Sequence, residues 1–180
     1  MKGDAIDQLV EQWHRERPEL DVSPTALLQR ITRVHLLQSA SFADVFARHG
    51  LTFGEFEMLA ALRRSGRPWR LKPTELYGAL VLSSGATTNR IDRLEAAGLV
   101  ERVPDPDDRR GTLVGLTPRG RKVLDAATAD HLANEERLLE ALSPRERDQL
   151  VRLLRKLLVS PPFMSLDPAQ PRRPRVPSGG

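Results

Sequence analysis

The 180-residue sequence contains no cysteine, few aromatic residues and no long apolar run. Without cysteine, disulfides, thiol redox sensing and cysteine-based metal sites are excluded. Aromatic residues make up only 4% of the chain, so Leu, Val, Ile and Ala must fill its core. No apolar run approaches the roughly 18 residues that span a bilayer, and the acidic N-terminal stretch does not fit a signal peptide. We therefore expect a cytoplasmic protein without a membrane partner.

Catalytic and metal-binding patterns are also missing. The histidines are scattered, with no i, i+4 pair and no histidine–acid cluster of the kind that binds zinc: His14, His35, His49 and His131. No segment resembles a nucleophile elbow, a phosphate-binding loop or a pair of catalytic carboxylates. The sequence predicts that the protein is not an enzyme and uses no metal or cofactor.

Positive charge is concentrated in the middle of the chain. The whole sequence has a net charge of +4, but residues 63–122 contain 13 Lys or Arg against 7 Asp or Glu, and the rest is slightly acidic. Contacts with nucleic acid phosphates require such a basic segment. An ordinary solvated surface can show the same balance, so charge alone leaves both interpretations open.

Helical patterns dominate the N-terminal part. Residues 4–16 place apolar side chains at i, i+3, i+4 and i+7, with Asp4 as the cap and an Arg-Pro pair at 17–18 as the end. A second helix is expected from Ser23, as its N-cap, to about Arg48. At ~36 Å, it is long enough to serve as a scaffold or a subunit interface.

The C-terminal part predicts two more helices and a tail. Thr117 and Pro118 open a helix that reaches about Ala141. The capping box Ser143–Glu146 opens a last helix with a wide leucine stripe. From Ser160 onward prolines recur, which predicts a disordered tail.

Between these parts the sequence predicts short helices followed by two strands. Helices are expected at 53–65, 74–80 and 84–97, a short extended segment at 68–71, and strands at 99–103 and 112–116. A polar, proline-containing loop joins the strands. The expected fold class is mainly α with a small two- to three-stranded β-wing, a winged helix-turn-helix flanked by N- and C-terminal helices.

This pattern divides the chain into four expected segments. They are the N-terminal helices (1–51), a winged helix-turn-helix domain (52–117), C-terminal dimerisation helices (118–159) and a disordered Pro/Arg-rich tail (160–180). One small winged domain cannot bury all the apolar stripes of the terminal helices. A homodimer would bury them, and packing within the monomer alone is the competing interpretation.

The helix at 84–97 has the composition of a helix that reads DNA. Its small first residues would let the backbone approach DNA closely, and its N-terminus adds amide groups that attract phosphate. The candidate DNA-binding residues are side chains able to bond base edges or phosphates: Ser84, Thr87, Thr88, Asn89 and Arg93. A merely well-capped surface helix is the alternative interpretation.

The loop between the strands supplies a second DNA-binding candidate. Arg109 and Arg110 lie at its tip, and Arg110 is expected to enter the minor groove, where narrow A·T-rich segments concentrate negative potential. Asp107 or Asp108 is expected to brace Arg110 through a carboxylate–guanidinium contact. A solvated charged turn is the alternative, but it does not explain three acids placed just before two arginines.

Two segments carry a specific motif. They read SSGATTNRIDRLEAAGLVERV and DPDDRRGTLVGLTPRGR, and together they contain the pattern LxxxGLVxR…DxRxxxVxLTxxG. Residues 56–124, which include both, resemble the MarR family of winged helix-turn-helix regulators, and the long flanking helices extend the resemblance to about residues 4–158. The resemblance implies a homodimer that binds a palindromic operator in double-stranded DNA, usually represses, and releases the DNA when a small ligand binds.

The N-terminal stretch WHRERPELD resembles the urate-responsive branch of that family, which also includes PecS-like and citrate- or aconitate-responsive regulators. The resemblance implies that Trp13, Arg90 and an acidic residue gather around an anionic effector such as urate or citrate, with Arg17 as a further contact. Glu57 stands where the branch usually has Asp, so the identity of the effector stays open. The N-terminal helices would then form one wall of the ligand pocket.

Arg90 would link this pocket to DNA. It lies between the inner and outer faces of its helix, so its guanidinium can pair with an acid inside or move towards an anion. A ligand that recruits Arg90 would disturb its expected contact with Glu57 and shift the DNA-reading helix. Simpler roles stay open, with Trp13 as a core aromatic, Arg90 as a phosphate contact and Arg17 as an exposed helix end.

The favoured function is therefore a ligand-responsive, homodimeric DNA-binding repressor. A ligand-insensitive winged-helix protein, architectural or constitutive in its DNA binding, is the alternative, and the Trp13–Glu57–Arg90 set separates the two. A third possibility is a partner-binding module that acts through its helical ends. Failure to bind DNA upstream of its own gene would favour that third function.

Overall fold

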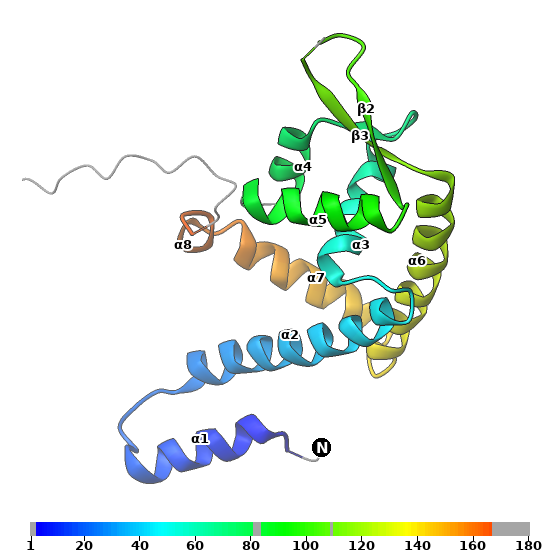
Figure 1. Cartoon of the computed structure of the whole chain (residues 1–180). Coiled ribbons are helices and arrows are strands. Elements are labelled where there is room, and N and C mark those ends of the chain that lie inside the picture. Colours follow the sequence, from blue (N-terminus) through cyan, green and yellow to red (C-terminus); the bar gives the residue numbers. More distant parts are fainter. Residues whose placement is uncertain (1–2, 81–83, 109, 167–180) are drawn as a thin grey trace, which may run out of the picture. The chain divides into compact units, whose positions relative to one another are not determined.

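The computed structural model describes residues 3–80, 84–108 and 110–166, without the side chains of residues 79–87. This part of the chain is mainly helical with one three-stranded antiparallel sheet, which confirms the predicted fold class (Figure 1). None of its helices is long and apolar enough to cross a membrane. The chain divides into two compact units, Met1–Asp44 and Val45–Gly180.

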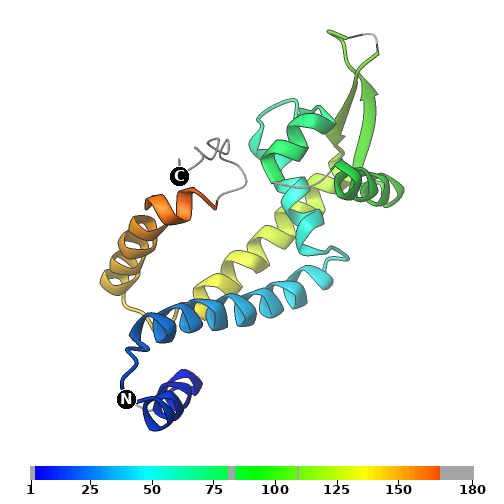
Figure 2. The ribbon, with the colours of Figure 1, turned by 90° about the vertical axis from the view of Figure 1, so that its left-hand side faces the viewer.

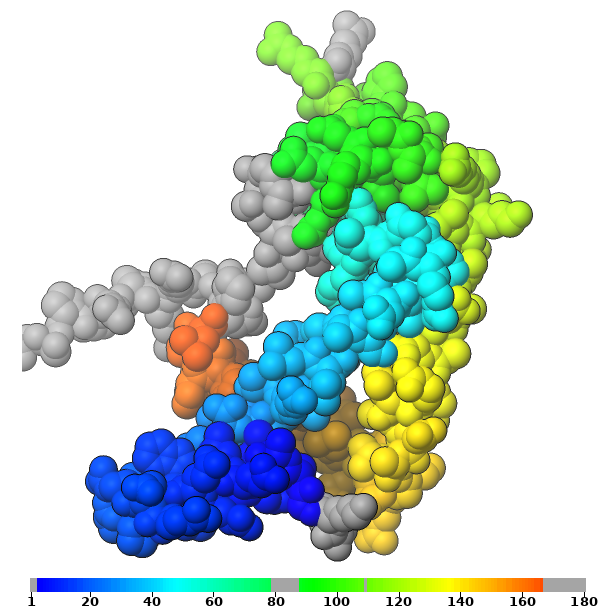
Figure 3. Space-filling view, turned by 60° about the horizontal axis from the view of Figure 1, so that its bottom comes forward, coloured from blue at the N-terminus to red at the C-terminus, as the bar shows by residue number. Residues whose placement is uncertain are grey.

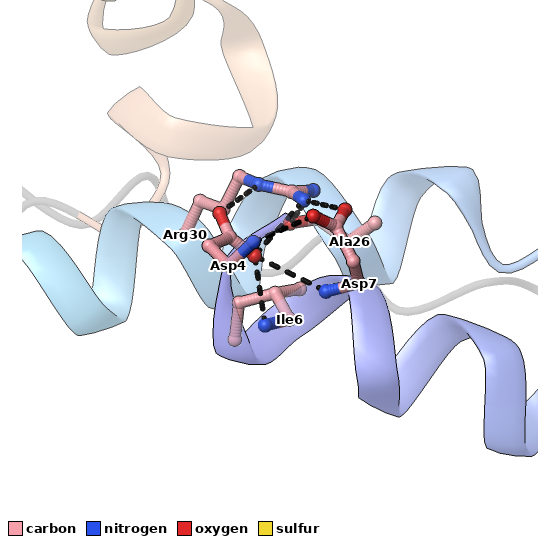
Figure 4. A network of polar contacts seen from close by, with 5 residues as sticks. All are labelled: Asp4, Ile6, Asp7, Ala26 and Arg30. Carbon is pink, nitrogen blue, oxygen red and sulfur yellow. Dashed lines mark hydrogen bonds and ion pairs between the residues drawn. The ribbon is translucent and has the colours of Figure 1, made fainter. Parts of the chain in front are cut away.

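The first unit contains α1 (Ala5–Glu16) and most of α2 (Ser23–Ala47). Asp4 caps α1, because its Oδ1 atom accepts hydrogen bonds from two backbone N–H groups of the first turn. Arg30 of α2 binds two acids, with Nε 2.8 Å from Asp4 Oδ2 and Nη2 2.5 Å from Asp7 Oδ1 (Figure 4). This network holds α1 against α2.

The start of α2 differs from the prediction. Ser23, the predicted N-cap, already belongs to the helix. The backbone N–H of Ser23 donates a hydrogen bond to Asp21 Oδ1 at 2.9 Å. That hydrogen bond holds the pKa of the Asp21 carboxyl below its usual range. An aspartate satisfies a free helical N–H as well as a serine does, so the residue types alone could not decide between them.

The second unit contains the remaining elements, and those that the sequence predicted follow in the predicted order. They are α3 (Phe53–Arg64), β1 (Arg70–Leu71), α4 (Pro73–Leu80), α5 (Ser84–Ala96), β2 (Val100–Pro104), β3 (Thr112–Leu116), α6 (Pro118–Leu138), α7 (Pro144–Leu158) and α8 (Pro161–Met164). The two predicted capping boxes, Thr52–Glu55 and Ser143–Glu146, both form.

Two predictions near the C-terminus are wrong. Helix α6 ends at Leu138 rather than near Ala141, because the N–H of Leu139 is shared between two carbonyls and the helical geometry is lost there. Ser160 does not begin a disordered tail, since a one-turn helix follows it directly. Pro161 opens that turn, where the missing N–H of proline has no helical partner to lose. Residues 167–180 lie outside the described part.

Strand β3 is the centre of the sheet, whose strand order is β1–β3–β2. Strands β2 and β3 form an antiparallel hairpin in which Val100 pairs with Leu116 and Pro104 with Thr112. The hairpin projects beyond the neighbouring helices, with its loop at the far end (Figure 2). Strand β1 lies in the segment predicted only as extended, and it adds the third strand at the other edge of β3.

Helix α3 is the centre of packing in the second unit. It contacts α4, α5, α6 and β3, and its Met58, Leu59 and Leu62 are fully buried. Phe46, at the end of α2, stacks on Phe56 with ring centroids 4.3 Å apart. The rest of the fully buried core is aliphatic, as the composition requires: Leu76, Ile91, Leu94, Val100 and Val114.

Two glycines determine how α5 and α6 join the sheet. Gly98, after α5, has φ 68°, a left-handed conformation that glycine adopts without strain. Gly120, in the first turn of α6, lies against the backbone, and a Cβ atom there would be 1.9 Å from the carbonyl oxygen of Leu99. The N-cap Thr117 donates to the carbonyl of Gly98 at 2.8 Å. These contacts join the wing closely to α6.

Candidate nucleic-acid interface

Helix α5 lies open on the surface of the second unit (green in Figure 3). Ile91 and Leu94 anchor it, with only 2% and 1% of their surfaces exposed. Thr88, Asn89 and Arg93 are exposed to solvent, as predicted for groups that contact DNA. Polar side chains on the open side of a helix can bond base edges or phosphates, so this side of α5 is the candidate reading surface.

Three of the predicted DNA contacts cannot be placed. Ser84 and Thr87 belong to α5, but their side chains lie outside the described part of the chain. Arg109 lies outside the described residues altogether. Their contacts with DNA therefore stay predictions.

Arg93 is linked to the first turn of α3. Its Nη2 atom lies 3.0 Å from Glu55 Oε1, and the carboxylate side chain is only 10% exposed. The other oxygen of Glu55 accepts hydrogen bonds from the backbone N–H and the hydroxyl of Thr52 at 2.7 and 2.8 Å. One carboxylate thus caps α3 and holds the exposed arginine of α5, a link that the sequence analysis did not predict.

Arg90 also reaches back to the first turn of α3. A Cβ atom on Gly54 would lie 2.4 Å from Arg90 Cζ and 2.7 Å from both terminal nitrogens, so the guanidinium rests directly on that glycine. The N-terminal end of α3 carries the positive end of the helix dipole. A guanidinium above a helix N-terminus makes this position attractive to an anion.

The predicted contact between Arg90 and Glu57 is wrong. Glu57 forms an ion pair with Arg64 on its own helix, at 4.0 Å. Gly54 is three residues before Glu57, so the two lie on the same side of α3 but one turn apart. The guanidinium of Arg90 therefore sits one turn nearer the start of α3 than the sequence suggested.

Trp13 and Arg17 belong to the first unit. Trp13 is 44% exposed on α1, so it is not a core aromatic of that unit. Arg17 closes α1 as its C-cap and forms an ion pair with Glu19. That these two residues gather with Arg90 and Glu57 around one ligand stays a prediction.

The loop of the wing is held by its own aspartates. Asp108 Oδ1 accepts a hydrogen bond from the backbone N–H of Arg110 at 3.0 Å. The expected contact between this carboxylate and the Arg110 guanidinium is absent from the described part of the chain. The short aspartate side chain reaches the N–H two residues on, as is usual in turns, and this leaves the exposed guanidinium of Arg110 available.

Asp105 links the wing to the start of α4. Its carboxylate is buried, with the N–H of Asp107 3.0 Å from Oδ1 and Lys72 Nζ 3.0 Å from Oδ2. The backbone hydrogen bond and then the lysine hold the pKa of Asp105 below its usual range. The same pair raises the pKa of Lys72. The base of the wing is therefore linked electrostatically to the helix-turn-helix.

Arg102 links the wing to α5. Its guanidinium binds Asp92 and Glu95 of α5, and its backbone N–H donates to Glu95 Oε1 at 3.1 Å. Hydrogen bonding to Asp92 is the main cause that raises the pKa of Arg102. Strand β2 and α5 are thus joined by side-chain and backbone contacts of one arginine.

Within the described residues, no group of His, Asp or Glu side chains could hold a metal ion. The chemistry of the site is instead that of exposed arginines and small polar groups on one helix and one hairpin. Such groups bind phosphates and base edges. Most of these side chains were predictable from the sequence, but their links to Gly54, Glu55, Lys72 and Glu95 were not, because these links depend on the tertiary fold.

Known DNA-binding regulators are similar to this chain, which agrees with the phosphate- and base-binding chemistry of the site. A model of the MarR family matches residues 49–111. The transcriptional regulator PecS of Dickeya dadantii is 36% identical over 149 residues, which cover 83% of this chain and 90% of PecS. The transcriptional repressor NicR of Pseudomonas putida is 34% identical over 147 residues, covering 78% of this chain and 90% of NicR.

A solved structure with bound DNA has a similar fold. The crystal structure of a MarR mutant from E. coli, complexed with operator DNA, matches with a TM-score of 0.65 at 27% sequence identity. The match covers 81% of this chain and 97% of the MarR chain.

Proposed function

The chain belongs to the MarR family of winged-helix transcriptional regulators, and from this premise we propose that it is a homodimeric repressor released from its operator by a small anion. Its relatives are DNA-binding regulators and not enzymes. In this proposal, α5 and the wing contact the operator, and the anion acts where α5 meets the start of α3. Urate and citrate are the first effectors to test.

One observation carries the proposal: two arginines of α5 reach back to the first turn of α3. Arg90 rests on Gly54, and Arg93 pairs with Glu55. These contacts at the start of α3 add to the burial of Ile91 and Leu94 in holding the reading helix in its orientation. A ligand that changes these contacts changes the helix that reads DNA.

An anion bound where α5 meets the start of α3 would affect two conformations differently: the one in which α5 reads DNA and the one in which α5 has moved away. It would be attracted by the guanidinium of Arg90 and by the N-terminal end of α3. It would also repel the carboxylate of Glu55 and compete with it for Arg93. The anion thus binds best when α5 has moved from its DNA-reading position, and such a difference in affinity is what shifts a conformational equilibrium.

Exposed apolar side chains support the homodimer. Within the described residues α7 has no buried residue, and its leucine stripe is open to solvent: Leu150, Leu153, Leu154 and Leu158 are 42%, 54%, 38% and 65% exposed. In the first unit α2 exposes Leu27, Leu28, Ile31, Val34, Leu36 and Leu37 in the same way. Apolar patches of this kind mark protein interfaces, and a second copy of the chain would cover them. A two-fold symmetric dimer fits a palindromic operator.

The proposal is tested by DNA binding with and without anions. The purified protein is titrated into labelled DNA from upstream of its own gene, and the dissociation constant is measured by fluorescence anisotropy at fixed ionic strength. Urate and citrate are then added at millimolar concentration, with chloride adjusted as the control. We expect specific binding to the upstream DNA and at least tenfold weaker binding with one of the two anions.

Two results would count against the proposal. If neither anion changes the affinity, the protein is a constitutive DNA-binding protein or responds to another class of ligand, and the anion hypothesis fails. If the upstream DNA binds no more tightly than unrelated DNA of equal length, the protein does not act at its own upstream region.

A further inference from the structure

A cluster of three arginines surrounds Trp69 at the base of the wing. The Cζ atoms of Arg63, Arg67 and Arg121 lie 4.6, 5.2 and 5.4 Å from the centroid of the indole ring. Arg63 comes from α3, Arg67 and Trp69 from the segment before β1, and Arg121 from α6. Three parts of the chain therefore bring positive charge to one aromatic side chain, and we call these four residues the Trp69 cluster.

The three guanidiniums have no carboxylate partner within the described part of the chain. The neighbouring arginines differ in this respect, because Arg64 contacts Glu57 at 4.0 Å and Arg70 contacts Glu101 at 3.8 Å. Glu57 and Glu101 thus pair with other arginines, and the three guanidiniums around Trp69 have no ion-pair partner among the described residues. This arrangement favours an anionic partner.

The Trp69 ring positions the arginines for such a partner. Stacking on an aromatic ring uses the face of a guanidinium and leaves its in-plane N–H donors available. Those donors match the spacing of oxygen atoms in a phosphate or carboxylate group. An oxyanion can therefore bind these N–H donors while the arginines stay beside the ring.

The backbone of Trp69 is held in an uncommon conformation. Its φ is 61°, a left-handed value that bulky residues seldom adopt. Its N–H donates to the carbonyl of Gly66 at 2.7 Å, and its carbonyl accepts from the N–H of Leu116 at 3.1 Å. Strained residues fixed in this way are found preferentially at ligand-binding positions, which agrees with the unpaired charge around the ring.

The Trp69 cluster is separate from the surface proposed to read DNA. Trp69 bonds to Leu116, the last residue of β3, whereas the wing tip lies beyond Thr112 at the other end of that strand (Figure 1). Five residues of strand span roughly 16 Å. The cluster also contains none of the side chains placed on the open side of α5.

We propose that the Trp69 cluster is a second anion site, which binds a compact oxyanion of the phosphoanhydride class carrying two or more negative charges. The three guanidiniums lie within 5.4 Å of the centroid of one ring, so a compact anion beside the ring is attracted by all of them. Free diphosphate is the smallest probe of this class. The site is distinct from the effector position at Arg90, and the proposal does not depend on the identity of that effector.

The test uses the fluorescence of Trp69 itself. The chain has two tryptophans, so Trp13→Phe leaves Trp69 as the only one. This variant is titrated with sodium pyrophosphate at constant ionic strength, with sodium chloride as the control. We expect a saturable change in emission with pyrophosphate and none with chloride.

Two further variants in the Trp13→Phe background show whether the change in Trp69 emission comes from pyrophosphate bound at the Trp69 cluster. Arg63→Gln combined with Arg121→Gln is expected to weaken pyrophosphate binding at least tenfold. Arg145→Gln removes an exposed arginine of α7 and is expected to leave the affinity unchanged. Isothermal titration calorimetry repeats the comparison without relying on the indole, and circular dichroism checks that each variant is folded.

The absence of a saturable response would overturn the proposal, as would equal pyrophosphate affinity in the double variant and the Arg145→Gln control. A third result would also overturn it: no pyrophosphate binding together with a tenfold loss of operator affinity in the double variant alone. That result would assign the cluster to the DNA backbone.

Discussion

Arg110 carries an exposed guanidinium at the wing tip, and its neighbour Asp108 binds its backbone instead of its side chain. Fixing the backbone while leaving the charge available suits an arginine that enters the minor groove. The sequence predicted the residue correctly as exposed but not how its neighbour holds it. The difference matters because, among the described residues, no ion pair of Arg110 has to be broken before it meets DNA.

Arg110→Ala is therefore expected to weaken operator binding by about 1–3 kcal/mol and to reduce the salt slope of the binding constant by about 1 if a phosphate contact is lost with it. Anisotropy titrations at several salt concentrations measure both. Arg145→Ala, on α7, is the matched control and should change neither. An unchanged affinity for Arg110→Ala at fixed salt would show that the wing arginine does not contact the operator.

Single residues also show where sequence reasoning reaches its limit. Asp4, Thr52 and Ser143 were identified as caps because a cap depends on residues three positions apart. The pairing of Arg93 with Glu55 depends on how α5 crosses α3, which no local spacing records. The contact expected for Arg90 was wrong by one helical turn for the same reason.

The wing is an element held at its base by an ion pair between a buried carboxylate and a half-exposed lysine. Asp105 is linked to Lys72 and to the backbone of its own loop. Since the pKa of Asp105 is lowered in the folded protein, the ionised carboxylate stabilises the fold. This contribution is complete above the ordinary aspartate pKa of about 3.9 and is lost as the pH falls from there through the lowered folded value.

Asp105→Asn is expected to lower the free energy of unfolding at neutral pH. The difference from the wild type should shrink as the pH falls. The amide keeps an oxygen for the loop hydrogen bond but cannot pair with Lys72 as a charge. Urea unfolding of both proteins between pH 7 and pH 3 measures the difference. Asp107→Asn removes the same charge from an exposed position of the loop. A gap between wild type and Asp105→Asn that stays constant down to pH 3 would contradict the role given to the ion pair.

The joint between α6 and the wing depends on close backbone contact. Gly120→Ala would place a Cβ atom 1.9 Å from the carbonyl oxygen of Leu99, a backbone atom that cannot move aside as a side chain can. We expect a loss of about 1–3 kcal/mol or more, as for other overpacked sites. Gly78→Ala is the control, since no atom of the described part of the chain lies within 4 Å of its Cβ position on α4. In thermal melts, the midpoint temperature of Gly120→Ala should be clearly below that of the wild type. The midpoint of Gly78→Ala should equal or exceed that of the wild type.

At the scale of the whole molecule, the order of helices and strands was predictable and the division into units was not. Periodicity, caps and glycines located every predicted helix of the described chain to within a few residues. The two compact units divide within α2, where no proline or glycine interrupts the helix. Helix α8 was missed because a proline-rich composition predicts disorder, although a serine followed by proline is also a helix start.

The proposed dimer predicts how the molecule behaves in solution. Leu150→Glu combined with Leu154→Glu places two charges on the open leucine stripe of α7 and should prevent another copy from covering it. Light scattering after size exclusion is expected to give about twice the chain mass of 20.2 kDa for the wild type and one chain mass for the variant. Gln149→Glu, also exposed on α7, should stay dimeric. A wild-type protein that is monomeric at micromolar concentration would contradict the dimer.

The central claim is that α5 both reads the operator and responds to the anion through Arg90. The most direct measurement is the operator dissociation constant with and without the effective anion, for wild type and for Arg90→Gln. We expect the anion to weaken wild-type binding at least tenfold and Arg90→Gln binding less than twofold, with Gly54→Ala, which displaces the guanidinium, intermediate between them. Equal release of the wild type and Arg90→Gln by the anion would contradict the claim.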